Sequence, residues 1–443
     1  MKVEVLECLY IKPLQLLKIW GRTDRPLSQA RISIKRGLFK QKESLGDATL
    51  DVYVRQPQKE CWKEQYNFVF QKVMPLEQKG GLSVFAELEQ DGNTEGHKLK
   101  ITFQDVPPEQ FCSSIGTKTG ILFQEKEQID RFCEGIRESG YCPPLTFLHV
   151  ESSSICNLKC RYCVVSNNYE CIERSVISDE VLTQAIETIK ETPTLKTVQI
   201  SGLGEPLTNP GFCDMLERIE KETHIRNVWF FTNAMLLTPE ISERLAQSKL
   251  NLRIVVSIDG NTPEENDFYR NGSKYEVVRR NLLTLLKETR KRPYFRIQIH
   301  NLVIRPKTEG DSGTLLPPPF LLEDFGFLKI DTHRAFYFPE LKDETLKADG
   351  MKVYREPHKQ FCKRMFLQAT IRSNGDVVRC HWDSTCSHVM GNILEKPFTA
   401  IWHGDKYIEL RKTMMPEAPF DALPLACQKC HAMNDGYLYS EDQ

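Results

Sequence analysis

Residues 156–163 read Cys156-Asn-Leu-Lys-Cys160-Arg-Tyr-Cys163 and follow closely on an apolar stretch at 146–150 that predicts a strand. The three cysteines are separated by three and then two residues, so they lie on one loop at the carboxyl end of that strand. Three thiolates on one loop can bind three irons of a [4Fe–4S] cluster and leave the fourth iron open to another ligand. Zinc is the alternative, but it usually takes four ligands, most often as two close pairs, so this spacing suits zinc poorly.

The sequence beyond this loop alternates between predicted strands and helices. Helices are predicted to begin near Ser178 and Thr262 and to span 273–291, where a capping Ser or Thr is followed by glutamate. Strands are predicted at 146–150, 197–200, 228–232, 252–258, 295–304 and 327–330. Repeated strand–helix units predict a parallel sheet covered by helices. About six such units are enough for a partial (β/α)6 barrel, but they fall short of the eight that a closed barrel needs.

Polar or glycine-containing segments follow the later strands of this series. Ser201-Gly202-Leu203-Gly204-Glu205-Pro206 follows the second strand, Thr232-Asn233 ends the third, and Ser257-Ile258-Asp259-Gly260 ends the fourth. Taken alone, the glycines fit an ordinary turn, and Ser257 and Asp259 fit a helix cap. Because α/β barrels place active sites at the carboxyl ends of their strands, the order of these segments predicts one shared site.

At these positions the chain resembles the radical S-adenosylmethionine (SAM) enzymes, in which Cys-x3-Cys-x2-Cys follows the first strand of a partial (β/α)6 barrel. The resemblance covers roughly residues 144–330. It implies that Cys156, Cys160 and Cys163 bind a [4Fe–4S] cluster whose open iron binds SAM. It also implies that electron transfer to SAM yields a 5′-deoxyadenosyl radical, which abstracts hydrogen from a substrate.

The same resemblance implies the residues that bind SAM. The segment at 201–206 is similar to a Gly-Gly-Glu-Pro motif that binds the methionine amine, with Leu203 in place of a glycine. Tyr162 matches a position that contacts adenine. The implied cofactor-binding residues are Tyr162, Gly202, Gly204, Glu205, Asn233, Ser257 and Asp259.

A general acid or base is not identified by the sequence. An alcohol that is oxidised through its radical needs a base to remove the hydroxyl proton. The candidates at the predicted barrel mouth are Glu151, Asp259, His300 and Arg305. A structural or cofactor-contacting role is the alternative for each of them.

A second group of cysteines follows the predicted barrel. Its members are Cys362, Cys380, Cys427 and Cys430, with a predicted hairpin turn at 372–376. Four thiolates can bind every iron of a second [4Fe–4S] cluster. Zinc is a stronger alternative here, because four thiolates satisfy it equally well and His381, His388 and His431 lie among the cysteines.

The order of these four cysteines resembles the twitch extension, which is the shortened form of the SPASM domain. This resemblance implies one auxiliary [4Fe–4S] cluster, used for electron transfer, where a full SPASM domain has two. Cys386 is left over, and it is interpreted as an alternative ligand, a redox-active residue or a small core residue.

The first 110 residues predict a different kind of fold. The β-rich stretches are 3–11, 14–20, 31–34, 50–54, 68–73, 82–88 and 99–103. Short strands at this spacing predict an antiparallel β-sandwich. The α/β chain is therefore divided into a β-sandwich accessory domain at 1–110, a connector at 111–144 with a helix at 126–138, the partial barrel at 145–335, and a small cysteine-rich, twitch/SPASM-like auxiliary cluster domain at 336–443.

Composition excludes several classes of protein. The 443 residues include 59 Lys and Arg against 60 Asp and Glu, so binding of nucleic acid through bulk positive charge is not expected. The start of the chain lacks the apolar region of a signal peptide, and no apolar run is long enough to span a membrane. Eight of the 15 cysteines fall in two clusters, three at 156–163 and five between Cys362 and Cys430, which predicts a cytoplasmic metal-binding protein, not a disulfide-bonded one.

The substrate is the least determined part of the prediction. Twitch and SPASM enzymes mostly modify either sugars and cyclitols or peptides, and many peptide-modifying members begin with a winged-helix domain, unlike the predicted sandwich. The expected activity is an oxidoreductase that oxidises, deoxygenates or epimerises a sugar, polyol or glycan-linked substrate, with flavodoxin or ferredoxin as electron donor. The alternatives are a peptide maturase of the same superfamily and a non-enzymatic metal-binding scaffold, which the intact motifs oppose.

Overall fold

The computed structural model describes most of the chain. The described residues are 3–11, 16–23, 27–36, 43–50, 66–74, 82–91, 93–104, 126–167, 173–200, 202–290, 292, 295–304, 315–335, 362, 364–381, 383, 388–428 and 430. Within these ranges, no helix has both the length and the apolar composition needed to cross a bilayer.

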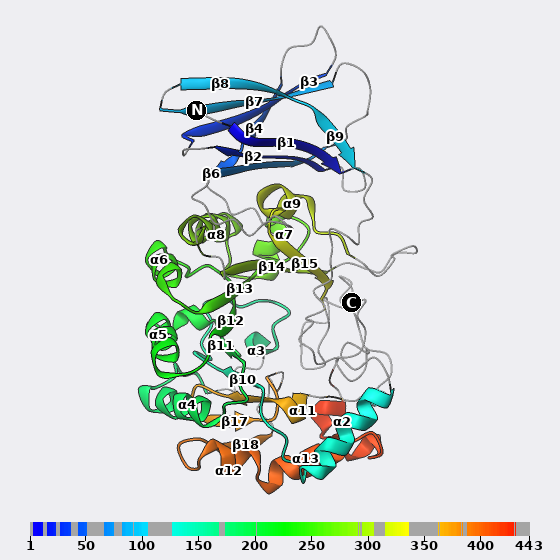
Figure 1. The fold of residues 1–443 in the computed structure, drawn as a ribbon. Helices are drawn as coiled ribbons and strands as arrows, with labels where there is room; N and C mark the ends of the chain where they lie inside the picture. The colour runs from blue at the N-terminus through cyan, green and yellow to red at the C-terminus, as the bar shows by residue number, and fades with distance from the viewer. Residues whose placement is uncertain are drawn as a thin grey trace.

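Two sheets near the N-terminus lie face to face (Figure 1). Their described strands are β1 (Val3–Ile11), β2 (Leu16–Thr23), β3 (Gln29–Arg36), β4 (Glu43–Asp47), β5 (Thr49–Leu50), β6 (Tyr66–Val73), β7 (Leu82–Gln90), β8 (Asn93–Leu99) and β9 (Ile101–Gln104). The strand orders are β5-β6-β2-β1-β9 and β4-β3-β7-β8. Leu17 and Ile19 of one sheet share a buried core with Ile32 and Ile34 of the other. This agrees with the predicted sandwich, but purely antiparallel pairing is wrong, because β9 runs parallel to β1.

Strands β4 and β8 were not predicted from the sequence. They form the two edges of the four-stranded sheet. Four of the five side chains at 93–97 are exposed, and three of the five in β4 are exposed. Edge strands that bury few side chains lack the apolar alternation by which strands are recognised.

Most of the remaining strands belong to one sheet, which has nine strands in the part of the chain that the structure describes. Its order is β15-β14-β13-β12-β11-β10-β16-β17-β18. The first six in chain order are β10 (Phe147–Val150), β11 (Thr197–Ile200), β12 (Asn227–Thr232), β13 (Asn251–Ser257), β14 (Arg296–Val303) and β15 (Lys329–Arg334). Each of these six pairs in parallel with the next, as the strand–helix alternation predicts.

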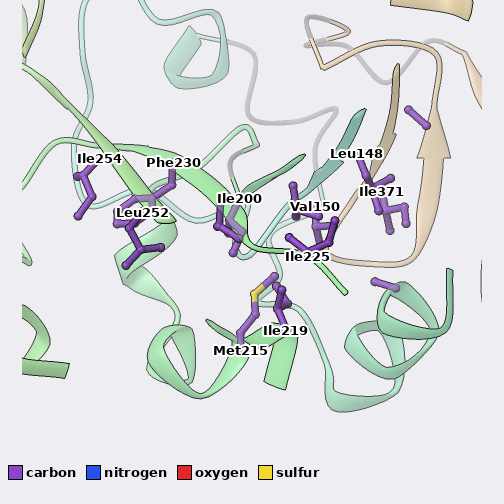
Figure 2. Packing of buried hydrophobic residues seen from close by; sticks show 14 of the residues in the cluster. Leu148, Val150, Ile200, Met215, Ile219, Ile225, Phe230, Leu252, Ile254 and Ile371 are labelled. Atoms are coloured by element: carbon purple, nitrogen blue, oxygen red, sulfur yellow. The ribbon is translucent and has the colours of Figure 1, made fainter. Parts of the chain in front are cut away.

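Helices cover one face of this sheet. They include α4 (Asp179–Glu191), α5 (Phe212–Glu222), α6 (Pro239–Gln247), α8 (Tyr275–Thr289) and α9 (Pro319–Phe325). The short helix α7 (Pro263–Tyr269) packs its Tyr269 in a separate small cluster with Val164. Figure 2 shows Met215 and Ile219 of α5 beneath Ile200 and Val150 of the strands, within one hydrophobic core. The apolar face of the sheet is therefore occupied by helix packing, and a site can lie only at the strand ends or on the other face.

The C-terminal segment continues the same sheet. Strand β16 (Gln368–Ile371) pairs in parallel with β10, and β17 (Asp376–Val378) and β18 (Val389–Asn392) add antiparallel strands beyond it. Ile371 lies beside Leu148 in Figure 2. The sequence suggested a separate small module, because strands of three or four residues carry too short a pattern to reveal their pairing with β10.

Short helices complete the C-terminal segment. They are α11 (Arg364–Leu367), α12 (Phe398–Trp402), α13 (Asp405–Met414) and α14 (Leu425–Gln428), with a 3-10 turn at Phe420–Ala422. Earlier in the chain, a short helix α3 spans Val164–Asn167 and a 3-10 turn spans Pro206–Thr208. Helix α2 (Lys126–Glu138), which confirms the predicted helix of the connector, packs Phe132 edge-on against Phe366. The connector helix thus belongs to the same core as the C-terminal segment.

The predicted start of α8 is wrong by two residues. The helix begins at Tyr275 after Lys274, without a side-chain cap. The hydroxyl of Ser273 accepts a hydrogen bond from the Asn266 amide, at 3.3 Å. Because its hydroxyl is engaged by Asn266 of helix α7, Ser273 does not act as the expected cap, whereas Ser178 and Thr262 do cap α4 and α7 as predicted.

Candidate functional site

The cysteine loop lies between the end of β10 and helix α3. Cys156, Cys160 and Cys163 form no disulfide in the structure. The pKa of Cys160 is raised to about 12, mainly by burial; Arg270 opposes this rise, and nearby Cys163, Asp259 and Cys156 add to it. The three sulfurs therefore share one electrostatic neighbourhood, in which thiolates need the compensating positive charge of a metal centre.

Backbone hydrogen bonds fix this loop against the segment that follows α7. The amide of Lys159 donates to the carbonyl of Asn271 at 2.8 Å, and the amide of Arg161 donates to the carbonyl of Tyr269 at 2.9 Å. The Arg161 guanidinium lies 4.4 Å from the centre of the exposed Phe268 ring. The loop is thus held at both sides of Cys160.

The donor set fits an iron–sulfur cluster better than a single metal ion. Three thiols on one loop match the ligands of a cluster with one open iron. In the described ranges, no three His, Cys, Asp or Glu side chains are grouped to hold one metal ion. A cluster spreads its thiolates over several irons, so it does not require them to converge on one point.

The two glycines after β11 are required by close packing. A Cβ on Gly202 would overlap the Glu151 carboxylate, and one on Gly204 would overlap the carbonyl oxygen of Ile155. The expected close approach of the backbone at these positions is present, and it is made to the chain's own cysteine loop. The segment after β11 is consequently packed directly on the residues that precede Cys156.

Glu205 connects that segment to the end of β12. Its carboxylate accepts hydrogen bonds from the Thr232 hydroxyl at 2.6 Å, the Asn233 amide at 2.8 Å and the Leu207 amide at 3.3 Å. Burial raises the pKa of Glu205, and these donors oppose that rise. The Asn233 side chain in turn donates to Asn157 of the cysteine loop at 2.9 Å. Glu205 and Asn233 are therefore brought to the cysteine loop, as predicted from strand order.

Tyr162, Asp259 and Arg270 form a buried cluster beside the cysteines. Arg270 donates to Asp259 at 2.6 Å and to the Tyr162 hydroxyl at 3.1 Å, and Tyr162 also donates to Asp259. The other Asp259 oxygen accepts the Leu302 amide at 2.7 Å. Sequence reasoning found Tyr162 and Asp259 but missed Arg270, which lies outside every recognised motif. The cluster joins the cysteine loop to the ends of β13 and β14.

Arg270→Met is expected to destabilise the metal-free protein by about 3–5 kcal/mol, because it leaves the Asp259 carboxylate buried without a counter-ion. Urea denaturation followed by circular dichroism measures this change. The exposed Arg280 on α8 provides the matched control, and Arg280→Met should change stability by less than about 0.5 kcal/mol. Equal midpoints for the two variants would show that the Arg270–Asp259 pair contributes nothing.

The four acid–base candidates occupy different environments. Glu151 and Asp259 are both held in buried ion pairs, which opposes a role as the catalytic acid or base for each. His300 pairs with Ser257 across β13 and β14, and burial lowers the pKa of His300, so the ring is neutral at pH 7. Arg305 lies outside the described residues.

A band of polar and aromatic side chains lies on the sheet face opposite the helices. The paired positions His149, Gln199, Trp229 and Arg253 come from the successive strands β10 to β13. Arg253 donates to Gln298 at 2.7 Å and lies 5.1 Å from the centre of the Trp229 ring. This face contrasts with the apolar face that packs on the helices.

His149 links this band to the second cysteine group. Its ring stacks on His381 with centres 4.2 Å apart, and its Nε2 lies 3.3 Å from the Gln368 oxygen. The Nδ1 atom is buried without a partner. Burial lowers the pKa of His149 to about 3, so the ring is neutral. His149 was not singled out from the sequence, because a histidine within a short apolar strand gives no functional signal.

The second group of cysteines also gathers in one place. Cys362 and Cys427 are buried, and Cys380 and Cys430 are half-buried. The pKa of Cys427 is raised to about 12, mainly by burial; Arg379 opposes this rise, and Cys362, Cys430 and Cys380 add to it. The four predicted ligands therefore lie within electrostatic reach of one another. Cys386 and His431 fall outside the described residues.

Arg379 supplies positive charge at this second group. Its guanidinium donates to the Cys427 sulfur at 2.6 Å and forms an ion pair with Asp383 at 3.4 Å. Hydrogen bonds to cluster sulfurs are one determinant of cluster reduction potential. Arg379 directly precedes Cys380 in sequence, but its direction towards Cys427 could not be predicted, because 48 residues separate the two.

Comparison with known proteins identifies two families in the chain. Residues 150–308 match the radical SAM superfamily, and residues 362–431 match SPASM, an iron–sulfur cluster-binding domain. A radical SAM domain implies a [4Fe–4S] cluster and SAM, and a SPASM domain implies additional iron–sulfur clusters. For the second cysteine group, this match favours iron–sulfur over zinc.

Individual relatives are distant. A tungsten-containing aldehyde ferredoxin oxidoreductase cofactor-modifying protein of Pyrococcus furiosus is 28% identical over 108 residues, which is 24% of this chain and 29% of that protein. Mycofactocin maturase MftC of Mycobacterium tuberculosis is 29% identical over 136 residues, 30% of this chain and 33% of that protein. The matches thus span about a third of each relative's length.

Among solved structures, anSMEcpe with bound AdoMet superposes with a TM-score of 0.46 and 19% identity, covering 65% of this chain and 85% of that one. The two family matches settle the class of protein. The chain is an enzyme of the radical SAM superfamily with a C-terminal SPASM iron–sulfur domain.

Proposed function

We propose that this enzyme is an oxidoreductase that oxidises, deoxygenates or epimerises a sugar, polyol or glycan-linked substrate. In this proposal Cys156, Cys160 and Cys163 bind the first cluster, and the segment from Gly202 to Glu205 binds SAM. When bound, the cluster and SAM together supply a 5′-deoxyadenosyl radical that abstracts hydrogen from a substrate carbon. The remaining SAM contacts are proposed for Tyr162, Asn233, Ser257 and Asp259.

The polar and aromatic band on the sheet face opposite the helices carries the substrate proposal. A polyhydroxylated molecule needs many hydrogen-bonding partners and a flat surface against which its C–H groups can pack. Gln199, Arg253 and Gln298 carry hydrogen-bonding groups, and the Trp229 ring offers a flat surface. The neutral His149 ring donates from Nε2 to the Gln368 oxygen, so its unpartnered Nδ1 can accept a hydrogen bond from a substrate hydroxyl.

The second cysteine group is proposed to bind one auxiliary [4Fe–4S] cluster through Cys362, Cys380, Cys427 and Cys430. Four thiolates would leave no iron open, so the substrate would not bind this cluster directly. Its role would be electron transfer, with Arg379 lowering the negative charge around Cys427. An external donor such as flavodoxin or ferredoxin would supply electrons to the first cluster.

Peptide modification is the second candidate. It is favoured by the match to a mycofactocin maturase. A peptide also carries many hydrogen-bonding groups, so the polar band is compatible with a peptide substrate as well. The two candidates differ in which deuterated compounds transfer deuterium to 5′-deoxyadenosine.

The experiment begins with anaerobic purification and cluster reconstitution. About eight irons per chain, with 5′-deoxyadenosine released on addition of SAM and dithionite, are expected for two [4Fe–4S] clusters. Pools of uniformly deuterated sugars and of deuterated peptides are then supplied separately. Deuterium in 5′-deoxyadenosine from the sugar pool alone supports the proposal, whereas transfer from the peptide pool alone assigns the second candidate. About four irons together with zinc would refute the auxiliary cluster.

His149→Phe is expected to reduce substrate-stimulated 5′-deoxyadenosine formation about threefold to tenfold, the loss expected for one neutral hydrogen bond. Phenylalanine keeps the stack on His381 but cannot bond a hydroxyl. SAM cleavage without substrate should be unchanged. The exposed His403 provides the control variant His403→Phe, which should behave as wild type. If substrate-stimulated 5′-deoxyadenosine formation were unchanged in His149→Phe, His149 would not belong to the substrate site.

A further inference from the structure

The Glu151 carboxylate joins three parts of the molecule. Its Oε1 accepts the Leu203 amide at 2.6 Å and the Arg372 guanidinium at 3.1 Å. Its Oε2 accepts both the amide and the hydroxyl of Ser373 at 3.2 Å. The side chains of Glu151 and Arg372 are only 2% and 4% exposed, so this ion pair is not screened by water.

Arg372 belongs to the C-terminal segment and is held there independently. It is the first residue of the turn between β16 and β17, in which Gly375 has a φ of +90°. Its second nitrogen donates to the carbonyl of Asp383 at 2.7 Å, and the Asp383 carboxylate pairs with Arg379. Arg379 then donates to Cys427. A continuous series of polar contacts thus runs from the Leu203 amide to the second cysteine group.

We propose that Arg372 is a positioning residue that, through Glu151, orders the segment from Gly202 to Glu205, so that the C-terminal segment sets the affinity for SAM. The inference rests on the proposed function, because it takes this segment as the SAM-binding segment. Glu151 alone could adopt other rotamers, but a carboxylate fixed by a charged, forked donor presents one oxygen to Leu203. The packing of Gly202 on Glu151 leaves the segment no room to move towards the cysteine loop.

Hydrogen exchange in the metal-free protein tests the ordering without any cofactor. In Arg372→Met, amide exchange in a peptide spanning 202–207 should accelerate about tenfold or more, as expected when a hydrogen bond to a charged group is lost. Arg411→Met is the matched control. Arg411 is also buried in the C-terminal segment but donates to the carbonyls of Met365, Tyr141 and Trp402. Equal acceleration in both variants would mean general destabilisation and would overturn the proposal.

SAM binding to the reconstituted protein provides the second test. Equilibrium dialysis should show Kd for SAM raised about tenfold in Arg372→Met and less in Arg372→Lys, which keeps the charge but loses the fork. Iron content at both sites should stay at the wild-type value. Wild-type protein that fails to bind SAM would refute the proposed function itself. Wild-type binding with unchanged Kd in both variants would refute only the role of Arg372.

Discussion

Cys160→Ala is expected to abolish release of 5′-deoxyadenosine when SAM and dithionite are added to the reconstituted enzyme. Cys160 is the central and most buried thiol of its loop, fixed by the flanking amides of Lys159 and Arg161. Without it the first cluster would lose one of three protein ligands, and no neighbouring cysteine on the loop could replace it. The measurement is 5′-deoxyadenosine by liquid chromatography and mass spectrometry.

Cys213→Ala is the control for this substitution. Cys213 is equally buried but lies on α5, in the hydrophobic core between sheet and helices. Its removal should cost some stability and leave SAM cleavage intact. Continued release of 5′-deoxyadenosine by Cys160→Ala would refute the assignment of the first cluster.

Cys427→Ala is expected to lower iron by about four per chain and to spare the first site. Cys427 is buried among the other three cysteines and accepts the Arg379 hydrogen bond, so its loss removes a ligand and leaves Arg379 without its sulfur acceptor. Iron and sulfide analysis, with electron paramagnetic resonance of the remaining cluster, measures the effect. SAM cleavage without substrate should persist.

The half-buried Cys142, which lies just before β10, provides the control variant Cys142→Ala. That variant should bind as much iron as the wild type. If Cys427→Ala also retained the full amount, the proposed ligand set of the second cluster would be wrong, and Cys386 would be the next residue to test.

Local features of the chain were predictable because they are encoded by neighbouring residues. The cysteine loop, the glycine segment and the capped starts of α4 and α7 each occupy fewer than ten consecutive positions. Parallel pairing of β10 to β15 followed from the strand–helix alternation. Their arrangement at one edge of the sheet then followed from geometry alone.

Contacts between distant segments could not be predicted. Glu151 was a candidate acid or base because a carboxylate at a strand end looks the same whether it faces solvent or an arginine. Its partner Arg372 is 221 residues away and carries no motif. Arg270 is only 11 residues from Asp259, but it was missed because it lies at the end of α7 and no local pattern marks it as the partner of that carboxylate.

The pairing of β16 with β10 constrains how the protein can be made. While a ribosome synthesises the chain, β10 and its cysteine loop emerge more than 200 residues before the strand that covers their edge. During that interval the nascent sheet has an unpaired parallel edge, which favours aggregation and slow, high-contact-order folding. Since the Glu151–Arg372 pair cannot form before Arg372 emerges, we expect the segment around Leu203 to reach its final order only after synthesis has passed that residue.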